Sequence, residues 1–331
     1  MLHSIAPSPP SISVILPTYN VEKYISHCLH SCLEQKFNSV EFIIVDDCGT
    51  DASIAIAETF ALRDPRFRII YSDKNVGTFL ARKKGVAQAT GKYILFLDPD
   101  DCLQTQALEK LFDLTNKAPT DIVFYSVGII PKQPITTLER CLPKKSDIPE
   151  SILKVVFCDT PNMSWGTPGK MYSRDVANKA FNELVFIKDR LTFAEDVLFL
   201  FSAAAHATSC ASHPEELYIY NKNPESITET KTISTMLKHG DQIDIITRYI
   251  KHLAQDKKLN ELHGALLHIA ASKVIGTLNS DKELMKRFLL DPQTGKSLYL
   301  KSAYNSYKSR SSLKDLARIL LYILTLTKFK F

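Results

Sequence analysis

Residues 11–126 alternate between short apolar runs rich in β-branched residues and longer segments with apolar residues at helical spacing. This alternation constrains the fold, because a strand, a helix and a further strand close most readily as a parallel pair with a crossover helix. The expected strands cover 13–16, 42–45, 67–71, 93–97 and 122–125, and the expected helices cover 21–35, 51–62, 75–89 and 105–115. The pattern predicts an α/β fold with a mostly parallel central sheet and flanking helices.

Polar residues gather directly after three of these expected strands. The clusters are PTYN at 17–20, DDCGTD at 46–51 and DPDD at 98–101. Each cluster alone is compatible with a turn and a helix cap. In a parallel sheet, however, the carboxyl ends of the strands meet at one edge, and ligands bind there. The three clusters together predict a binding site at this edge.

The DPDD segment places three carboxylates within four residues. Such close like charges repel one another unless they are solvated or neutralised by a cation. Mg²⁺ and Mn²⁺ prefer oxygen ligands and are commonly held by one or two carboxylates together with substrate phosphates. Neither GxGxxG nor GxxxxGK[ST] follows the first expected strand, so glycine-rich phosphate binding is not indicated. The segment predicts a Mn²⁺ or Mg²⁺ cofactor that stabilises a departing nucleoside diphosphate.

The segments ILPTYN, VDDCGTD, NVGTFLAR and FLDPDD, in this order and spacing, resemble the nucleotide-binding half of inverting family 2 glycosyltransferases with the GT-A fold. The likeness is close over 11–115 and looser as far as 228. The DPDD wording and a basic C-terminal tail are similar to those of bacterial lipooligosaccharide and lipopolysaccharide β-1,3-galactosyltransferases. The resemblance implies a metal-dependent transfer of a hexose, from UDP-galactose or another UDP-hexose, to a glycan acceptor in lipopolysaccharide or lipooligosaccharide biosynthesis.

The resemblance also implies roles for individual residues in binding the nucleotide-sugar. Those residues are Pro17, Thr18, Tyr19, Asn20, Asp46, Asp47, Arg82, Asp98, Pro99 and Asp100. Tyr19 would pack on the nucleobase, Asp47 would accept a hydrogen bond from uracil, and Arg82 would reach the base edge or the diphosphate. Asp100 and Asp101 would bind the metal. Two alignments of DPDD with the DxD motif of the family are possible, so the division of labour among its three aspartates stays open.

An inverting transfer needs a carboxylate that takes the proton of the acceptor hydroxyl as it attacks. The resemblance assigns Asp196 as this base and Glu195 as its neighbour or an acceptor contact, at the start of the helix AEDVLFLF. Acidic residues at that position also pair with the helix dipole. Trp165 and Lys170 would contact the acceptor. Where the family reads W-G-K-L-Y, this chain inserts three residues, 167–169, between Trp165-Gly166 and Lys170.

Together with the pattern along the chain, the resemblance implies an N-terminal tail (1–10), a GT-A catalytic domain (11–228) and a helical C-terminal region (229–331). The catalytic domain has a nucleotide-sugar-binding half (11–126) and an acceptor half (150–228), with a Pro- and Lys-rich linker between them. The tail at 312–331 mixes lysines with Leu, Ile and Phe, which predicts contact with a membrane surface. A final helix docked on the core is the alternative.

The net charge of +5 over 331 residues indicates no nucleic-acid partner. The sequence contains neither a signal-peptide pattern nor a run of 18 apolar residues. We therefore expect a cytoplasmic protein, peripheral at the inner face of the membrane, that meets a lipid-linked oligosaccharide acceptor.

Other functions are also compatible with these motifs. The donor could be a GDP- or dTDP-sugar used for capsule or protein glycan. A nucleotidyltransferase or nucleotide-sugar hydrolase would use a similar sheet and metal, but the glycine- and lysine-rich loop usual for such enzymes is missing. A non-catalytic sugar-nucleotide-binding domain would not need the paired acids at 195–196.

Overall fold

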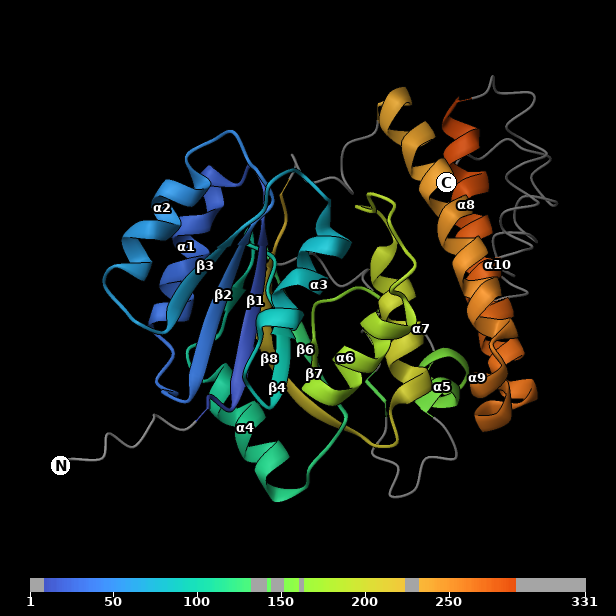
Figure 1. Ribbon diagram of the computed structural model, residues 1–331, viewed down its shortest axis with the longest axis horizontal. Helices are drawn as coiled ribbons and strands as arrows, with labels where there is room; N and C mark the ends of the chain where they lie inside the picture. Colours follow the sequence, from blue (N-terminus) through green and yellow to red (C-terminus); the bar gives the residue numbers. More distant parts are fainter. Residues whose placement is uncertain (1–8, 132–141, 144–151, 161–163, 224–231, 290–331) are drawn as a thin grey trace.

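The computed structural model describes residues 9–131, 142–143, 152–160, 164–223 and 232–289. Within these residues the centre of the fold is an eight-stranded sheet of order β3-β2-β1-β4-β7-β6-β8-β5 (Figure 1). Its strands are β1 (Ile12–Thr18), β2 (Val40–Asp46), β3 (Phe67–Tyr71), β4 (Tyr93–Phe96), β5 (Cys102–Leu103), β6 (Ile122–Ile130), β7 (Lys170–Ser173) and β8 (Cys210–Asn221).

The strands predicted from the alternating pattern are all present. β1 pairs in parallel with β2 and β4, β2 pairs in parallel with β3, and β6 pairs in parallel with β8. β7 runs antiparallel between β4 and β6, and β5 runs antiparallel to β8. The predicted mostly parallel sheet is therefore confirmed, with β7 and the short β5 as its antiparallel strands. Thr18 lies opposite Asp46 in the register, so β1 and β2 end side by side.

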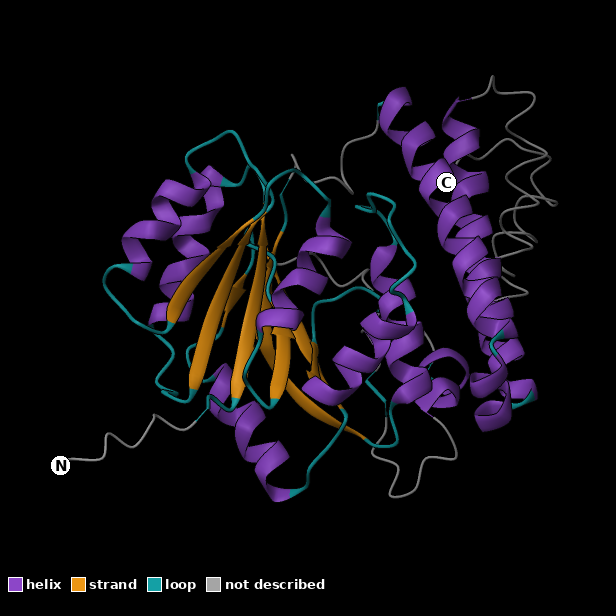
Figure 2. Ribbon diagram, in the orientation of Figure 1, coloured by secondary structure: helices purple, strands orange, loops and turns teal. Residues whose placement is uncertain are grey.

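Helices cover both faces of the sheet (Figure 2). One apolar cluster joins the sheet to α1 (Glu22–Leu33), α2 (Ser53–Ala61) and α4 (Ala107–Lys117). The other joins it to α3 (Thr78–Gln88), α6 (Arg174–Glu183), α7 (Glu195–His206) and the short α5 (Ile152–Lys154) and η1 (Val155–Asp159). Successive residues of β1 enter opposite clusters: Val14 and Leu16 enter the first, and Ile15 enters the second. This two-sided burial explains why the strands read as continuous apolar runs.

The C-terminal region is helical, as predicted, with α8 (Ile233–Gln255), α9 (Lys257–His263) and α10 (Ala265–Leu289). Its buried residues, including Ile243, Ile250, Val274 and Leu278, belong to the same apolar cluster as α3 and α7. The C-terminal helices thus share a core with the sheet domain. Among the described helices, none combines the length and apolarity needed to cross a bilayer. The predicted membrane-binding tail at 312–331 lies outside the described residues.

Helix α3 lies very close to the sheet at Gly85. A Cβ atom at this position would lie 2.4 Å from Ile15 Cγ2 and 3.2 Å from Val45 Cγ2, so only glycine allows the approach. Arg82 precedes Gly85 by three residues and lies on the same face of the helix. The close packing at Gly85 therefore fixes the depth at which the Arg82 side chain enters the fold.

We expect Gly85→Ala to destabilise the protein by about 1–3 kcal/mol, the usual cost of forcing an extra carbon into a packed core. Gly240→Ala in α8 is the matched control, because the nearest atom to an added Cβ there is Lys282 Cε at 3.9 Å. The control should gain about 0.5–1 kcal/mol from the higher helix propensity of alanine. Urea unfolding measures both free energies. An equal gain in the two variants would contradict the close approach of α3 to the sheet.

Candidate active site

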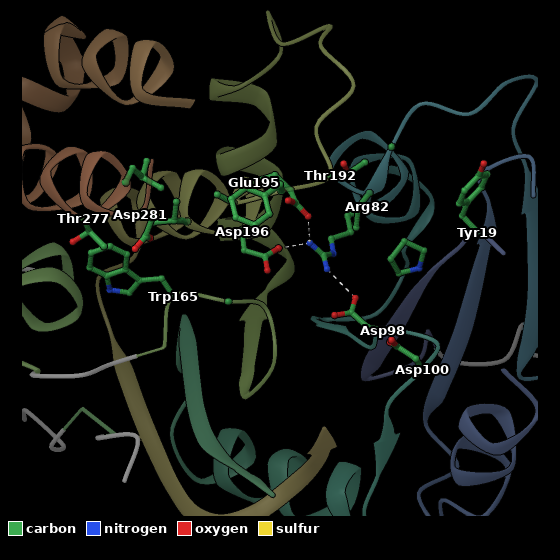
Figure 3. A pocket seen from close by; sticks show the side chains of 18 of the residues that line it. Tyr19, Arg82, Asp98, Asp100, Trp165, Thr192, Glu195, Asp196, Thr277 and Asp281 are labelled. Carbon is green, nitrogen blue, oxygen red and sulfur yellow. Dashed lines mark hydrogen bonds and ion pairs between the residues drawn. The ribbon is translucent and has the colours of Figure 1, made fainter. Parts of the chain in front are cut away.

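A cavity of about 1220 Å³ lies at the carboxyl ends of β1, β2 and β4 and extends past α7 to α10. Most of the predicted site residues line it, and Figure 3 shows several of them around its centre. These are Pro17, Tyr19, Asn20, Asp47, Arg82, Asp98, Pro99, Asp100, Trp165, Glu195 and Asp196. The structure thus brings together side chains that lie more than 170 residues apart in the sequence. The remaining predictions, Thr18, Asp46, Asp101 and Lys170, do not line the cavity.

The buried guanidinium of Arg82 joins three carboxylates at the middle of the cavity (Figure 3). Arg82 Nη2 donates to Asp98 Oδ1 at 2.8 Å, and Nη1 donates to Glu195 Oε1 at 3.1 Å and to Asp196 Oδ1. Burial lowers the pKa of Arg82, but the charges of Asp196, Asp98 and Glu195 raise it by more. The net pKa lies above the usual value, so the group stays charged. We predicted that Arg82 would reach the base or diphosphate; here its partners are the carboxylates of the site itself.

Asp196 lies in the first turn of α7 and is held by a residue that sequence reasoning missed. Thr167 donates to it twice, from its backbone N–H to Oδ2 at 3.1 Å and from its hydroxyl to Oδ1 at 2.5 Å. Burial raises the pKa of Asp196, but the Arg82 charge and the Thr167 hydrogen bonds hold it below its usual value. Thr167 lies in the insertion 167–169, where the sequence departs from the W-G-K-L-Y pattern of the family. This departure is the sequence signal that could have pointed to Thr167.

Glu195 is 6 % exposed, and its pKa shifts in the opposite direction from that of Asp196. Burial, followed by the adjacent Asp196 charge, raises the pKa of Glu195 to about 8. Two adjacent carboxyl groups whose pKa values are separated by their surroundings take different roles. Burial and the neighbouring charge thus favour the protonated form of Glu195, whereas Arg82 and Thr167 favour the ionised form of Asp196.

The three aspartates of DPDD point to different partners. Asp98 pairs with Arg82, and Asp100 Oδ2 accepts a hydrogen bond from Asn223 Nδ2 at 3.2 Å at the cavity wall. Asp101 is 1 % exposed and is tied to β8, accepting from Tyr218 Oη at 2.6 Å and from the backbone N–H of Asn221 at 2.8 Å. Asp98 and Asp100 therefore face the cavity, whereas the oxygens of Asp101 are engaged behind it.

The chemistry at Asp100 fits a divalent cation. Burial, together with the neighbouring Asp98 charge, raises the pKa of Asp100, and a bound cation would relieve both effects. Over the described ranges, no group of three or more His, Cys, Asp or Glu side chains is arranged to hold a metal alone. Mg²⁺ is commonly held by one or two carboxylates together with substrate phosphates.

The loops after β1 and β2 form the end of the cavity that lies opposite α10. Tyr19 is 42 % exposed and borders the cavity beside Pro17. Asp47 accepts from the backbone N–H groups of Val76 at 2.7 Å and Gly77 at 2.9 Å. Gly77 has a φ of 85°, and a Cβ atom there would lie 2.9 Å from the Leu191 carbonyl, so this turn requires glycine. The turn fixes Asp47 at the cavity wall.

The predicted residues outside the lining shape the adjacent loops. Asp46 accepts from the backbone N–H of Cys48 at 2.9 Å, and the Thr18 hydroxyl donates to the Leu16 carbonyl at 3.1 Å. Lys170 is 2 % exposed, and its Nζ donates to the carbonyls of Gly166 and, at 3.4 Å, Pro168. Lys170 therefore shapes the loop that carries Thr167 and does not face the cavity, contrary to the predicted acceptor contact.

Comparison with known families agrees with this geometry. Residues 13–167 match the family model described as glycosyl transferase family 2. This match covers slightly less than half of the chain. Glycosyltransferase EpsJ of Bacillus subtilis is 34% identical over 238 residues, which is 70% of this chain and 66% of EpsJ. Succinoglycan biosynthesis protein ExoO of Rhizobium meliloti is 27% identical over 66% of this chain and 63% of ExoO. The chain thus spans slightly less than two thirds of the length of these relatives.

Solved structures share the fold at low sequence identity. Residues 1–349 of S. aureus TarS, in complex with UDP-GlcNAc, superpose with a TM-score of 0.63 at 18% identity, covering 97% of this chain and 93% of that one. The mannosyltransferase PcManGT from Pyrobaculum calidifontis, in complex with GDP-Man and Mn²⁺, gives 0.56 at 15% identity, with 97% and 81% covered. The predicted GT-A fold is confirmed.

The raised pKa of Glu195 predicts a pH-dependent loss of stability. Between its ordinary pKa of 4.5 and about 8, the folded state keeps a proton that the unfolded state has lost, so stability falls as pH rises through this window. Glu195→Gln should remove this dependence, which at most amounts to about 1.4 kcal/mol per pH unit. Urea unfolding at pH 5, 6.5 and 8 measures it. Glu261→Gln, at an exposed position of α9, is the control. Equal pH dependence in the native protein and Glu195→Gln would contradict the assignment.

Proposed function

We propose that this protein is a metal-dependent inverting glycosyltransferase that moves a hexose from a UDP-sugar to a hydroxyl group of a glycan. The observation that carries the proposal is the division of one cavity by Arg82. Asp98 and Asp100 lie on one side of it, which we assign to the donor, and Asp196 lies on the other side at the start of α7 (Figure 3). A direct displacement needs a leaving-group site and a base on opposite sides of the sugar, and this arrangement supplies both.

The base has one oxygen available for the reaction. Oδ1 of Asp196 accepts from Arg82 and Thr167, whereas Oδ2 accepts only from the Thr167 backbone among the described residues. Its side chain is 26% exposed towards the cavity. In the proposed reaction, Oδ2 takes the proton of the acceptor hydroxyl as its oxygen bonds to the anomeric carbon. The bond from that carbon to the diphosphate oxygen breaks at the same time, which inverts the configuration.

The residues at the donor side would hold the leaving group. Asp100 would ligate Mn²⁺ or Mg²⁺ together with the diphosphate, and Asp98 would address the ribose. When bound, the cation supplies charge neutralisation to the departing diphosphate. Tyr19 would pack against the nucleobase, and Asp47 would accept a hydrogen bond from it, because both border the far end of the cavity.

UDP is the favoured nucleotide. The UDP-GlcNAc complex of TarS supports a uridine donor on this fold, and the GDP-Man complex of PcManGT keeps GDP-sugars as the alternative. UDP-galactose and a role in lipopolysaccharide or lipooligosaccharide synthesis are the more specific form of the proposal, from the DPDD wording and basic tail. A GDP- or dTDP-sugar used for capsule or protein glycan is the competing form. The name of the relative ExoO indicates polysaccharide biosynthesis in that protein.

The place of action follows from the acceptor. A lipid-linked oligosaccharide would be met at the inner face of the cytoplasmic membrane, with the enzyme held there peripherally through the basic tail at 312–331. Seven Lys or Arg residues and one acidic residue lie within 301–331. Attraction of such a tail to anionic lipid weakens as salt screens the charges.

Asp196→Asn should abolish transfer and leave donor binding intact, because the amide cannot take the acceptor proton. We expect the turnover number to fall by about 10²–10⁴-fold, the usual contribution of a general base. Turnover is measured as release of nucleoside diphosphate across a panel of UDP-, GDP- and dTDP-sugars, and binding is measured by calorimetry with UDP and Mn²⁺. Asp241→Asn, at an exposed position of α8, is the matched control. Normal turnover of Asp196→Asn would refute the base assignment.

Chelation and two aspartate variants test the metal. EDTA should remove activity, and added Mn²⁺ should restore it. Asp100→Asn should weaken Mn²⁺ binding in the presence of UDP, by about tenfold or more for a lost carboxylate ligand. Asp101→Asn should leave Mn²⁺ affinity unchanged because its oxygens face β8. Paramagnetic resonance of free Mn²⁺ measures both affinities. Full activity in chelator would contradict the metal proposal, and Mn²⁺ loss confined to Asp101→Asn would reverse the two roles.

A further inference from the structure

The cavity extends beyond the donor residues to a helix that lies outside the family match. Lys273, Thr277 and Asp281 of α10 line it, at intervals of four residues on one face of that helix. The match to the family ends at residue 167. The volume of about 1220 Å³ exceeds the roughly 300–1,000 Å³ typical of a pocket for one small ligand. The cavity therefore has room for a second molecule beside the nucleotide-sugar.

The second part of the cavity lies on the acceptor side of the base. In Figure 3, Trp165, Thr277 and Asp281 lie together on one side of Asp196, and Tyr19 lies on the other. The Trp165 ring packs on Phe157 of η1 with a centroid distance of 5.4 Å, and α10 packs against η1. The η1 segment therefore contacts both Trp165 and α10, and it holds the indole ring beside the polar face of that helix. Thr277 is 3 % exposed, so its position is fixed by its neighbours.

We propose that Trp165, Thr277 and Asp281 form a subsite for a neutral pyranose ring of the acceptor glycan. This inference rests on the proposed function and assigns the substrate-binding end of the same cavity. An indole ring offers a flat apolar face to the C–H groups of a sugar, with an N–H at its edge. A hydroxyl and a carboxylate offer hydrogen bonds that fix orientation in an otherwise apolar pocket. Both kinds of contact occur side by side here.

The charges favour a neutral ring over an anionic one. Asp159 and Asp281 border this end of the cavity together with Lys273, and the charge of Asp196 is balanced by its ion pair with Arg82. A phosphate or carboxylate group entering this end would meet a net negative potential. A neutral sugar would instead use the carboxylates as hydrogen-bond acceptors. Its reacting hydroxyl would then lie towards Oδ2 of Asp196.

The subsite can be tested without activity, because Trp165 is the only tryptophan in the chain. The full-length protein, with and without UDP and Mn²⁺, is titrated with methyl glycosides of glucose, galactose, mannose and N-acetylglucosamine. Protection of the indole fluorescence from acrylamide quenching measures occupancy. We expect at least one glycoside to protect Trp165 saturably. Asp281→Asn should weaken this binding by about tenfold and Thr277→Val by about threefold, from the loss of one hydrogen bond each.

Asp241→Asn on the exposed face of α8 is the matched control and should leave the titration unchanged. The inference is overturned if no glycoside protects Trp165, or if protection is the same in Asp281→Asn and Thr277→Val as in the native protein. Protection by sn-glycerol 3-phosphate in place of the neutral glycosides would also overturn it. Calorimetry with UDP is independent of this readout. Failure to bind nucleotide would contradict the proposed function alone, and failure of glycosides to protect Trp165 would contradict the subsite alone.

Discussion

The ion cluster around Arg82 is the interaction on which the rest of the site depends. One buried guanidinium connects α3, the loop after β4 and the first turn of α7 by bonds to Asp98, Glu195 and Asp196. Removing one partner of a buried pair leaves an uncompensated charge, which is strongly destabilising. The cluster can exist only because α3 lies close to the sheet, and Gly85 permits that approach. Backbone packing and charge placement are therefore parts of the same constraint.

One positive charge among three carboxylates leaves an excess of negative charge, which has two consequences. At the α7 side, the excess and the burial together raise the pKa of Glu195 while Asp196 remains ionised. At the β4 side, Asp100 adds a further carboxylate whose pKa is raised by burial and by Asp98, and which suits a divalent cation. The same imbalance therefore favours the protonated form of Glu195 and leaves Asp100 in surroundings that a bound cation would stabilise.

The C-terminal helices belong to the site as well as to the core. Their apolar residues share one cluster with α3 and α7, and one face of α10 closes the cavity opposite the donor loops. The loops of the sheet form one end of the cavity, and the shape of the other end depends on what packs beside α7. In this chain that neighbour is α10. Under the proposed function, α10 is the element that would shape the acceptor end of the cavity.

The sequence by itself determined five of the eight strands, the helices between them and the edge at which their polar loops meet, because periodicity and turn chemistry act over a few residues. It did not predict β5, β7 or β8. It also placed the acid pair at a helix start. It could not decide which aspartate of DPDD faces the cavity. That choice depends on Tyr218 and Asn221, which are about 120 positions away and occupy the oxygens of Asp101. Thr167, the burial of Lys170 and the approach of Thr277 were likewise decided only by the tertiary structure, because each depends on contacts between distant segments that no local pattern encodes.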